Sequence, residues 1–169
     1  MVKKIKVNLT AKGLDLLERE FKELEKRTKD LPELITHELL VEGKKLISEN
    51  MKKQSIQGVT GSLENSIFSK QRKNKGTFGV ESEYAKFVEY GTGIVGENNP
   101  HPEPGDWEYN VPSEHKTLDG GWVYYDEHLN RFQFTYGAVS KPFMYHTYYD
   151  LRDISIEIAK RIVGELLND

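Results

Sequence analysis

Cysteine is absent from this chain of 169 residues. Neither disulfide bonds nor cysteine-based zinc sites can therefore form, and the absence suits a reducing compartment. Long apolar runs are missing as well. The first residues lack the apolar stretch of a signal peptide, and no segment reaches the roughly 20 apolar residues that a membrane span needs. These absences predict a cytoplasmic protein without membrane contact.

Catalytic motifs are scarce. The chain has no Gly-x-Ser-x-Gly sequence, and His37-Glu38 begins like the zinc motif His-Glu-x-x-His but has Val41 where the second histidine belongs. A zinc site needs three or four well-placed ligands, and a Ser–His–Asp set stays open because geometry alone defines it. We predict no catalytic residue, no metal and no cofactor. A metal hydrolase would be a competing class, and it would use the histidines of expected loops, His101, His115 and His128.

The segment from Gly91 to Gly96 satisfies Gly-x-Gly-x-x-Gly. A dinucleotide site needs a strand before this motif and a helix after it. The following residues, 97–102, include two prolines and disfavour such a helix, and Glu97 would lie beside a phosphate. We predict instead a bend in which Gly91 or Gly93 adopts a positive φ.

Charge is divided unevenly along the chain. The formal net charge is -3, yet residues 1–76 carry a net +6 and residues 77–169 a net -9. A molecule with a basic half and an acidic half can stack head to tail on copies of itself. Two solvated surfaces are the alternative interpretation.

The first half of the chain predicts two helices and two strands. Apolar residues recur at helical spacing in 12–30, and Leu31-Pro32 then favours a second helix that ends near Lys53. Residues 58–61 read as a turn. Short strands are expected at 67–68 and 77–81, joined by a basic loop over 70–76.

The second half predicts a short helix or turn at 84–90, a long loop and a hairpin. Residues 94–121 hold four of the six prolines, which indicates a long inserted loop. Residues 122–125 and 131–136 alternate like a hairpin, and a last helix begins near Pro142. The order predicts a single α+β domain over 1–169, with N-terminal helices and a C-terminal helix packed on one face of a small antiparallel sheet.

Two surface features could bind partners. The basic hairpin could contact phosphates or an acidic surface by charge alone, or form a solvated tip. It has no interleaved aromatic residue for base stacking, and its cations are Lys70, Arg72, Lys73 and Lys75. An aromatic-rich zone between Trp107 and Tyr136 predicts either cross-strand packing or a protein interface.

Four short boxes, in order, resemble one protein family. The family's first helix is matched by residues 12–17, Lys-Gly-Leu-Asp-Leu-Leu. Its helix-to-strand junction is matched by Thr60-Gly61-Ser62-Leu63 with Asn65-Ser66-Ile67. Its most distinctive box is matched by Tyr84-Ala85 and Val88-Glu89-Tyr90-Gly91-Thr92. The approach to its last helix is matched by Thr135-Tyr136-Gly137 and Pro142-Phe143-Met144. Together the boxes resemble the tail-completion, or head–tail joining, proteins of long-tailed DNA bacteriophages and prophages.

The resemblance implies a small α+β virion subunit with no enzymatic role. It implies assembly as a homo-oligomeric ring between the connector, or neck, of the DNA-filled head and the tail tube or tail terminator, after synthesis in the host bacterial cytoplasm. Contact with phage DNA through the basic hairpin is an additional expectation. The alternative is a small cytoplasmic nucleic-acid-binding or regulatory protein that uses residues 70–75. The long loop over 94–121 departs from the family pattern. The residues that match the family motifs, and that the resemblance implies to be structural or interface residues, are Gly61, Leu63, Ser66, Ile67, Tyr84, Ala85, Val88, Glu89, Tyr90, Gly91, Thr92, Pro142, Phe143 and Met144.

Overall fold

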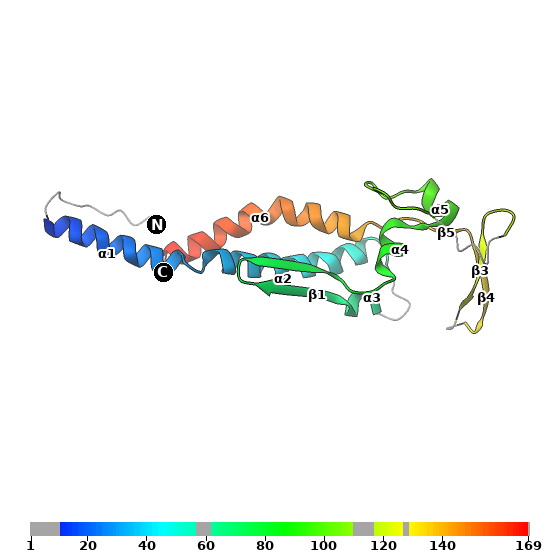
Figure 1. Ribbon diagram of the computed structural model, residues 1–169, viewed down its shortest axis with the longest axis horizontal. Coiled ribbons are helices and arrows are strands. Elements are labelled where there is room, and N and C mark those ends of the chain that lie inside the picture. Colours follow the sequence, from blue (N-terminus) through cyan, green and yellow to red (C-terminus); the bar gives the residue numbers. More distant parts are fainter. Residues whose placement is uncertain (1–10, 57–61, 110–116, 127–128, 169) are drawn as a thin grey trace.

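The protein is elongated, with its long helices running along the longest axis (Figure 1). The computed structural model describes residues 11–56, 62–109, 117–126 and 129–168. Helices and two small antiparallel sheets combine, so the predicted α+β class is confirmed. In chain order the elements are α1 (Ala11–Thr28), α2 (Leu31–Lys53), α3 (Ser62–Asn65), β1 (Ile67–Arg72), β2 (Lys75–Val80), α4 (Ala85–Tyr90), α5 (Gly93–Asn98), β3 (Trp122–Asp126), β4 (Arg131–Thr135), β5 (Gly137–Ala138) and α6 (Phe143–Asn168).

Helix α2 lies at the centre of the molecule. The β1–β2 hairpin packs along one side of α2, and α6 runs along the other side in the opposite direction (Figure 1). Gly43 of α2 allows the close approach of the hairpin, because a Cβ there would lie 3.0 Å from Phe78 Cζ. Asn50 Nδ2 of α2 donates to Asp150 Oδ2 of α6 at 2.9 Å, which ties the two helices together.

The core forms where α2, α3 and α6 meet. Ile47 and Met51 of α2, Leu63 of α3 and Phe143 of α6 form one buried cluster, and Ile47 and Phe143 are fully buried. Burying such a side chain contributes about 1.5–3 kcal/mol. Ile67, Phe78, Val80, Ala85, Val88 and Met144 pack around this cluster.

Helix α1 begins and ends close to the predicted bounds but extends away from the rest of the molecule (Figure 1). Leu14, Phe21 and Leu24, which mark its apolar face, are exposed. An i,i+4 ion pair joins Lys22 and Glu18 at 2.6 Å and supports the helix locally. Of the two N-terminal helices expected to pack on the sheet, α2 therefore packs on the β1–β2 hairpin and α1 does not.

Two loop predictions were wrong in their bounds. The basic hairpin loop is short, because β1 continues to Arg72 and β2 begins at Lys75. Only Lys73 and Asn74 form the turn, and Lys73 has a φ of 54°. The segment predicted as a loop over 94–121 instead begins within helix α5, and its Trp107 packs against Phe87 and Tyr90 of α4. Residues 110–116 lie outside the described residues. The turn predicted over 58–61 lies outside the described residues.

Candidate functional site

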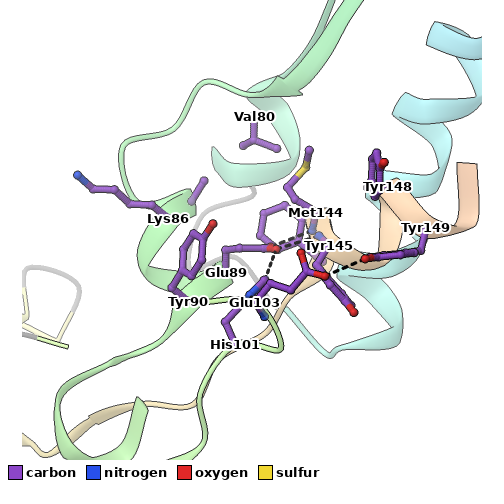
Figure 2. A pocket seen from close by; sticks show the side chains of 12 residues that line it. Val80, Lys86, Glu89, Tyr90, His101, Glu103, Met144, Tyr145, Tyr148 and Tyr149 are labelled. Atoms are coloured by element: carbon purple, nitrogen blue, oxygen red, sulfur yellow. Dashed lines mark hydrogen bonds and ion pairs between the residues drawn. The ribbon is translucent and has the colours of Figure 1, made fainter. Parts of the chain in front are cut away.

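The strongest polar cluster of the described chain lies where α4 meets the start of α6. Figure 2 shows the Glu89 side chain reaching from α4 toward α6, with His101 beside it. Glu89 is only 6 % exposed and His101 only 5 %. A buried carboxylate is costly unless hydrogen bonds satisfy it, so the partners of Glu89 decide what this cluster does.

Glu89 holds the N-terminus of α6. Its Oε2 accepts a hydrogen bond from the Met144 backbone N–H at 2.8 Å, and its Oε1 accepts one from the Tyr145 N–H at 2.9 Å. These N–H groups lie in the first turn of α6, where a helix leaves its donors without internal partners. The negative charge also complements the helix dipole. Ser140 Oγ donates to the Glu89 carbonyl at 2.6 Å and Lys141 N–H to the Val88 carbonyl at 2.9 Å, so α4 fixes where α6 begins.

His101 fastens the following segment to the same carboxylate. His101 Nδ1 accepts a hydrogen bond from the Glu103 backbone N–H at 2.9 Å. The ring proton must then be on Nε2, which lies 3.1 Å from Glu89 Oε1 and donates to it. His101, one of the three histidines of expected loops, is therefore buried and hydrogen-bonded, while His115 and His128 lie outside the described residues.

Aromatic side chains cover this cluster. The Tyr90 ring stacks on Trp107 with centroids 5.0 Å apart, and it also contacts His101 at 4.6 Å. Trp107 Nε1 donates to the Gly91 carbonyl at 3.2 Å. The part of the predicted long loop between α5 and Trp107 is thus packed against α4.

The glycines after α4 turn the chain sharply. Gly91 has a φ of 79° and Gly93 a φ of 60°, so both adopt the positive φ that was predicted for at least one of them. A Cβ at Gly93 would lie 2.5 Å from the Tyr136 carbonyl oxygen. Helix α5 starts inside the motif at Gly93 and ends at Asn98, and no helix begins among residues 97–102. A helix rather than a strand precedes the glycines, so the context of a dinucleotide site is not met.

A groove of about 440 Å³ opens beside the cluster, between α4, the segment after α5 and the first turns of α6. Tyr145, Tyr148 and Tyr149 line it together with Glu103. Tyr149 donates its hydroxyl proton to Glu103 Oε1 at 2.8 Å, and this hydrogen bond raises the pKa of Tyr149 to about 12.

The hydrogen bonds of the cluster limit its chemistry. Both ring nitrogens of His101 and both carboxylate oxygens of Glu89 are already engaged. A general base must reach the proton that it abstracts, and here that would require breaking one of these bonds. Among the described residues no group of His, Asp or Glu has the arrangement of a metal site. The geometry is suited to joining α4, α6 and residues 101–103.

Three of the four boxes that carry the family resemblance meet in this region, whereas the first box, residues 12–17, lies on α1 away from it (Figure 1). Leu63 and Phe143 belong to the buried core, and Ile67, Ala85, Val88 and Met144 pack against it. Ser66 Oγ donates to the Leu63 carbonyl at 2.8 Å, and Thr92 Oγ1 accepts from the Ala138 N–H at 3.1 Å. The Pro142 carbonyl accepts from the His146 N–H within the first turn of α6. Tyr84 is exposed, and Gly61 lies outside the described residues.

The basic hairpin has four exposed cations, of which Lys70 forms an ion pair. Lys70 Nζ pairs with Glu81 Oε1 at 2.7 Å. Arg72, Lys73 and Lys75 are exposed, and no ion pair within the described ranges involves them. Gln71 Nε2 donates to the Glu33 carbonyl at 2.9 Å, so the hairpin tip lies beside the first turns of α2.

Comparison with protein-family models, curated proteins and solved structures found no match. Among the described helices, none combines the length and apolar character that crossing a membrane requires.

The sequence placed Glu89 within a motif but did not reveal that it binds the first turn of α6. It also gave no prediction that His101 and Trp107 pack beside Glu89. A usable signal was present. Pro100, Pro102 and Pro104 bracket His101 and limit its backbone, and Trp107 follows shortly after. Tryptophan buries a large apolar area when it packs, and its N–H usually finds a partner when it is buried, so Trp107 beside this stiff segment indicated packing.

Proposed function

We propose that this protein is a structural virion subunit of a tailed bacteriophage or prophage. It acts in head–tail joining, or tail completion, as a ring-forming subunit between the connector and the tail. Its partners are further copies of itself, connector or neck proteins, and the tail tube or tail terminator. It carries no catalytic activity and no cofactor, and it is found in the host cytoplasm before assembly and in the virion afterwards.

The observation that supports this proposal is the convergence of three resembling boxes on one folded unit. The junction around Leu63, the box around Glu89 and the box at Phe143 come from distant parts of the sequence, yet they share one core and one hydrogen-bonded hub. Apolar residues of any chain gather in its core, so the specific support is the hub, where Glu89 of one box binds the N–H groups of Met144 and Tyr145 at another. The burial of this hub argues that the boxes preserve the shape of a subunit.

The placement of charge supports assembly between copies. Three of the four exposed cations, Arg72, Lys73 and Lys75, lie beside the N-terminal turns of α2. The exposed carboxylates Glu83, just before α4, and Glu97, in α5, belong to elements that Figure 1 shows beyond the other end of α2. Opposite charges at opposite ends favour head-to-tail contacts, which can close into a ring. Such charges raise the rate of encounter and orient the two copies more than they increase the affinity.

The second candidate function is nucleic-acid binding through the same three cations. Their exposure, without an internal ion pair among the described residues, favours it. Such binding would be governed by phosphate charge, so its affinity would fall with salt and would not depend on base sequence. Equal binding to unrelated duplexes, lost at raised salt, would support this function.

Deletion of the gene from the phage or prophage genome tests the main proposal. We expect lysates to contain DNA-filled heads and separate tails, seen by electron microscopy, and a plasmid copy of the gene to restore joined virions. Normal joined virions in the deletion lysate would overturn the assignment.

A further inference from the structure

The β3–β4 hairpin forms one end of the molecule and lies crosswise to the long helices (Figure 1). Within the described ranges its sheet contains these two strands alone. A two-stranded hairpin has little stability by itself in water. Each strand also has an outer edge whose backbone N–H and C=O groups can template a further strand.

One face of this hairpin exposes four aromatic side chains. Val123 lies opposite Phe134 and Tyr125 lies opposite Phe132, so these residues share a face. Phe132 is 73 % exposed, although its ring contacts Tyr125 with centroids 5.2 Å apart. Phe134 and Tyr136 extend the same face, with centroids 4.8 Å apart. Exposed aromatic clusters of this kind are typical of protein interfaces.

The two strands are complementary to each other. Within the hairpin, Arg131 of β4 lies opposite Asp126 of β3, and the aromatic Phe132 lies opposite Tyr125. This pairing uses one edge of each strand. The outer edge of β4 therefore presents the same residue order to any β3 strand that approaches it. In the same antiparallel register, Arg131 would lie beside Asp126 of a second copy and Phe132 beside its Tyr125.

Pairing of like edges lacks this complementarity. If β3 paired with β3 of a second copy around a two-fold axis, Asp126 would lie near the Trp122 end of the other strand. If β4 paired with β4, Arg131 would lie near the Thr135 end. In both cases the opposite charges are separated, so charge favours unlike edges. Contacts between unlike edges repeat from copy to copy without a two-fold axis.

From this complementarity we infer that the β3–β4 hairpin is a self-association surface. The outer edge of β4 in one copy pairs with the outer edge of β3 in the next, which continues the antiparallel sheet and joins the aromatic faces. The inference rests on the proposed self-assembly, and it identifies the surface through which two copies contact each other. The occupant is a second copy of this chain.

The cysteine-free sequence allows a direct test. Tyr124→Cys and Gln133→Cys are made in separate full-length chains. These two positions lie opposite each other on the other face of the hairpin, so the aromatic face is unchanged and both Asp126 and Arg131 are kept. With a short thiol-reactive crosslinker, we expect crosslinked dimers when the two variants are mixed and none with either variant alone. Crosslinking of either variant alone, or no crosslinking in the mixture, would overturn the inference.

A matched pair of further substitutions locates the contact. Phe132→Thr keeps a residue that favours strands and should lower the yield of crosslinked dimers several-fold. Phe21→Thr removes a similarly exposed aromatic ring from α1, 60 % exposed against 73 %, and should leave the yield unchanged. A loss of yield with Phe21→Thr and none with Phe132→Thr would place the interface on α1 instead.

The two proposals can fail separately. If the deletion lysate holds separate heads and tails but the mixed variants do not crosslink, edge pairing is wrong and the virion role stands. If the mixture crosslinks as expected but the deletion lysate holds normal virions, edge pairing stands and the virion role is wrong.

Discussion

The protein contains two antiparallel hairpins, and they differ in what covers them. One face of β1–β2 lies on α2, and its Phe78 packs against the core. Leu40 of α2 is so close to the hairpin that a Cβ added at Gly76 would lie 2.7 Å from Leu40 Cδ1. In β3–β4 no residue of either strand is buried, and Phe132 is largely exposed. The first hairpin is completed by its own chain, whereas the second offers its surface to another.

The difference follows from position along the fold rather than from composition. Both hairpins contain apolar and aromatic residues, and only β1–β2 lies beside a long helix with a glycine facing it. The Glu89 hub lies between them. It orients α6 on one side, while the bend at Gly91 and Gly93 carries the chain toward the second hairpin on the other. A covered region and an exposed region are therefore joined at a buried, hydrogen-bonded hub.

The largest expected effect comes from breaking the hub. Glu89→Ala leaves the Met144 and Tyr145 N–H groups and the His101 Nε2–H without an acceptor. Each buried unsatisfied donor costs about 1–3 kcal/mol, so we expect a loss of at least about 3 kcal/mol in the free energy of unfolding. Urea denaturation measures it. Glu83→Ala, at an exposed position, should change stability by less than about 0.5 kcal/mol, and equal stability of the two variants would contradict the role of Glu89.

The second effect concerns the bend that separates the two regions. Gly93→Val should cost about 1–3 kcal/mol, because a β-branched residue resists a φ of 60°. Its Cβ would also lie 2.5 Å from the Tyr136 carbonyl oxygen. Gly91→Val should behave similarly. Thermal melting is the measurement, and the control is Gly164→Val in α6, where a Cβ meets nothing within 4 Å. Melting of both bend variants at the temperature of the control would show that the bend tolerates side chains.

The third effect tests the exposed cations of the first hairpin. Reversal of Arg72, Lys73 and Lys75 to Glu should weaken assembly and flatten its dependence on salt, because exposed charge pairs are screened once the Debye length falls below about 10 Å. Each pair contributes only about 0–1 kcal/mol, so the change should appear chiefly in the rate of assembly. Light scattering across a salt series follows it. Lys70→Glu is the matched control, since Lys70 already pairs with Glu81 within the chain. Unchanged assembly of the triple variant would mean that the tip is solvated.

The smallest effect is a dependence on alkaline pH. The hydrogen bond to Glu103 raises the pKa of Tyr149 to about 12, above its ordinary value of 10. The stabilisation from this proton is complete below the ordinary pKa, and it is lost as pH rises through the folded pKa. Wild type should therefore melt above Tyr149→Phe at neutral pH, and the difference should disappear between pH 10 and about 12. Tyr148→Phe removes a hydroxyl that makes no hydrogen bond among the described residues, and it should show no such convergence.

Local patterns in the sequence predicted most of the secondary structure. Spacing of apolar residues and Pro32 placed α1 and α2, and alternation placed β3 and β4. These signals are local, because helix and strand periods are written in neighbouring residues. The predicted loop bounds were wrong for the same reason. The charged residues Lys70–Arg72 carry no local strand pattern, and their strand forms because they pair with β2 and lie beside α2.

The sequence alone determined the α+β class, the order of the long elements, the sharp bend at Gly91 and Gly93, and the absence of any cysteine chemistry. The tertiary structure alone decided that Glu89 and His101 are buried partners at the start of α6, and that one hairpin is covered while the other is exposed. Burial and hydrogen-bond partners join residues far apart in the chain, such as Glu89 and Tyr145. No window of sequence contains both ends of such a contact, so only folding in three dimensions brings them together.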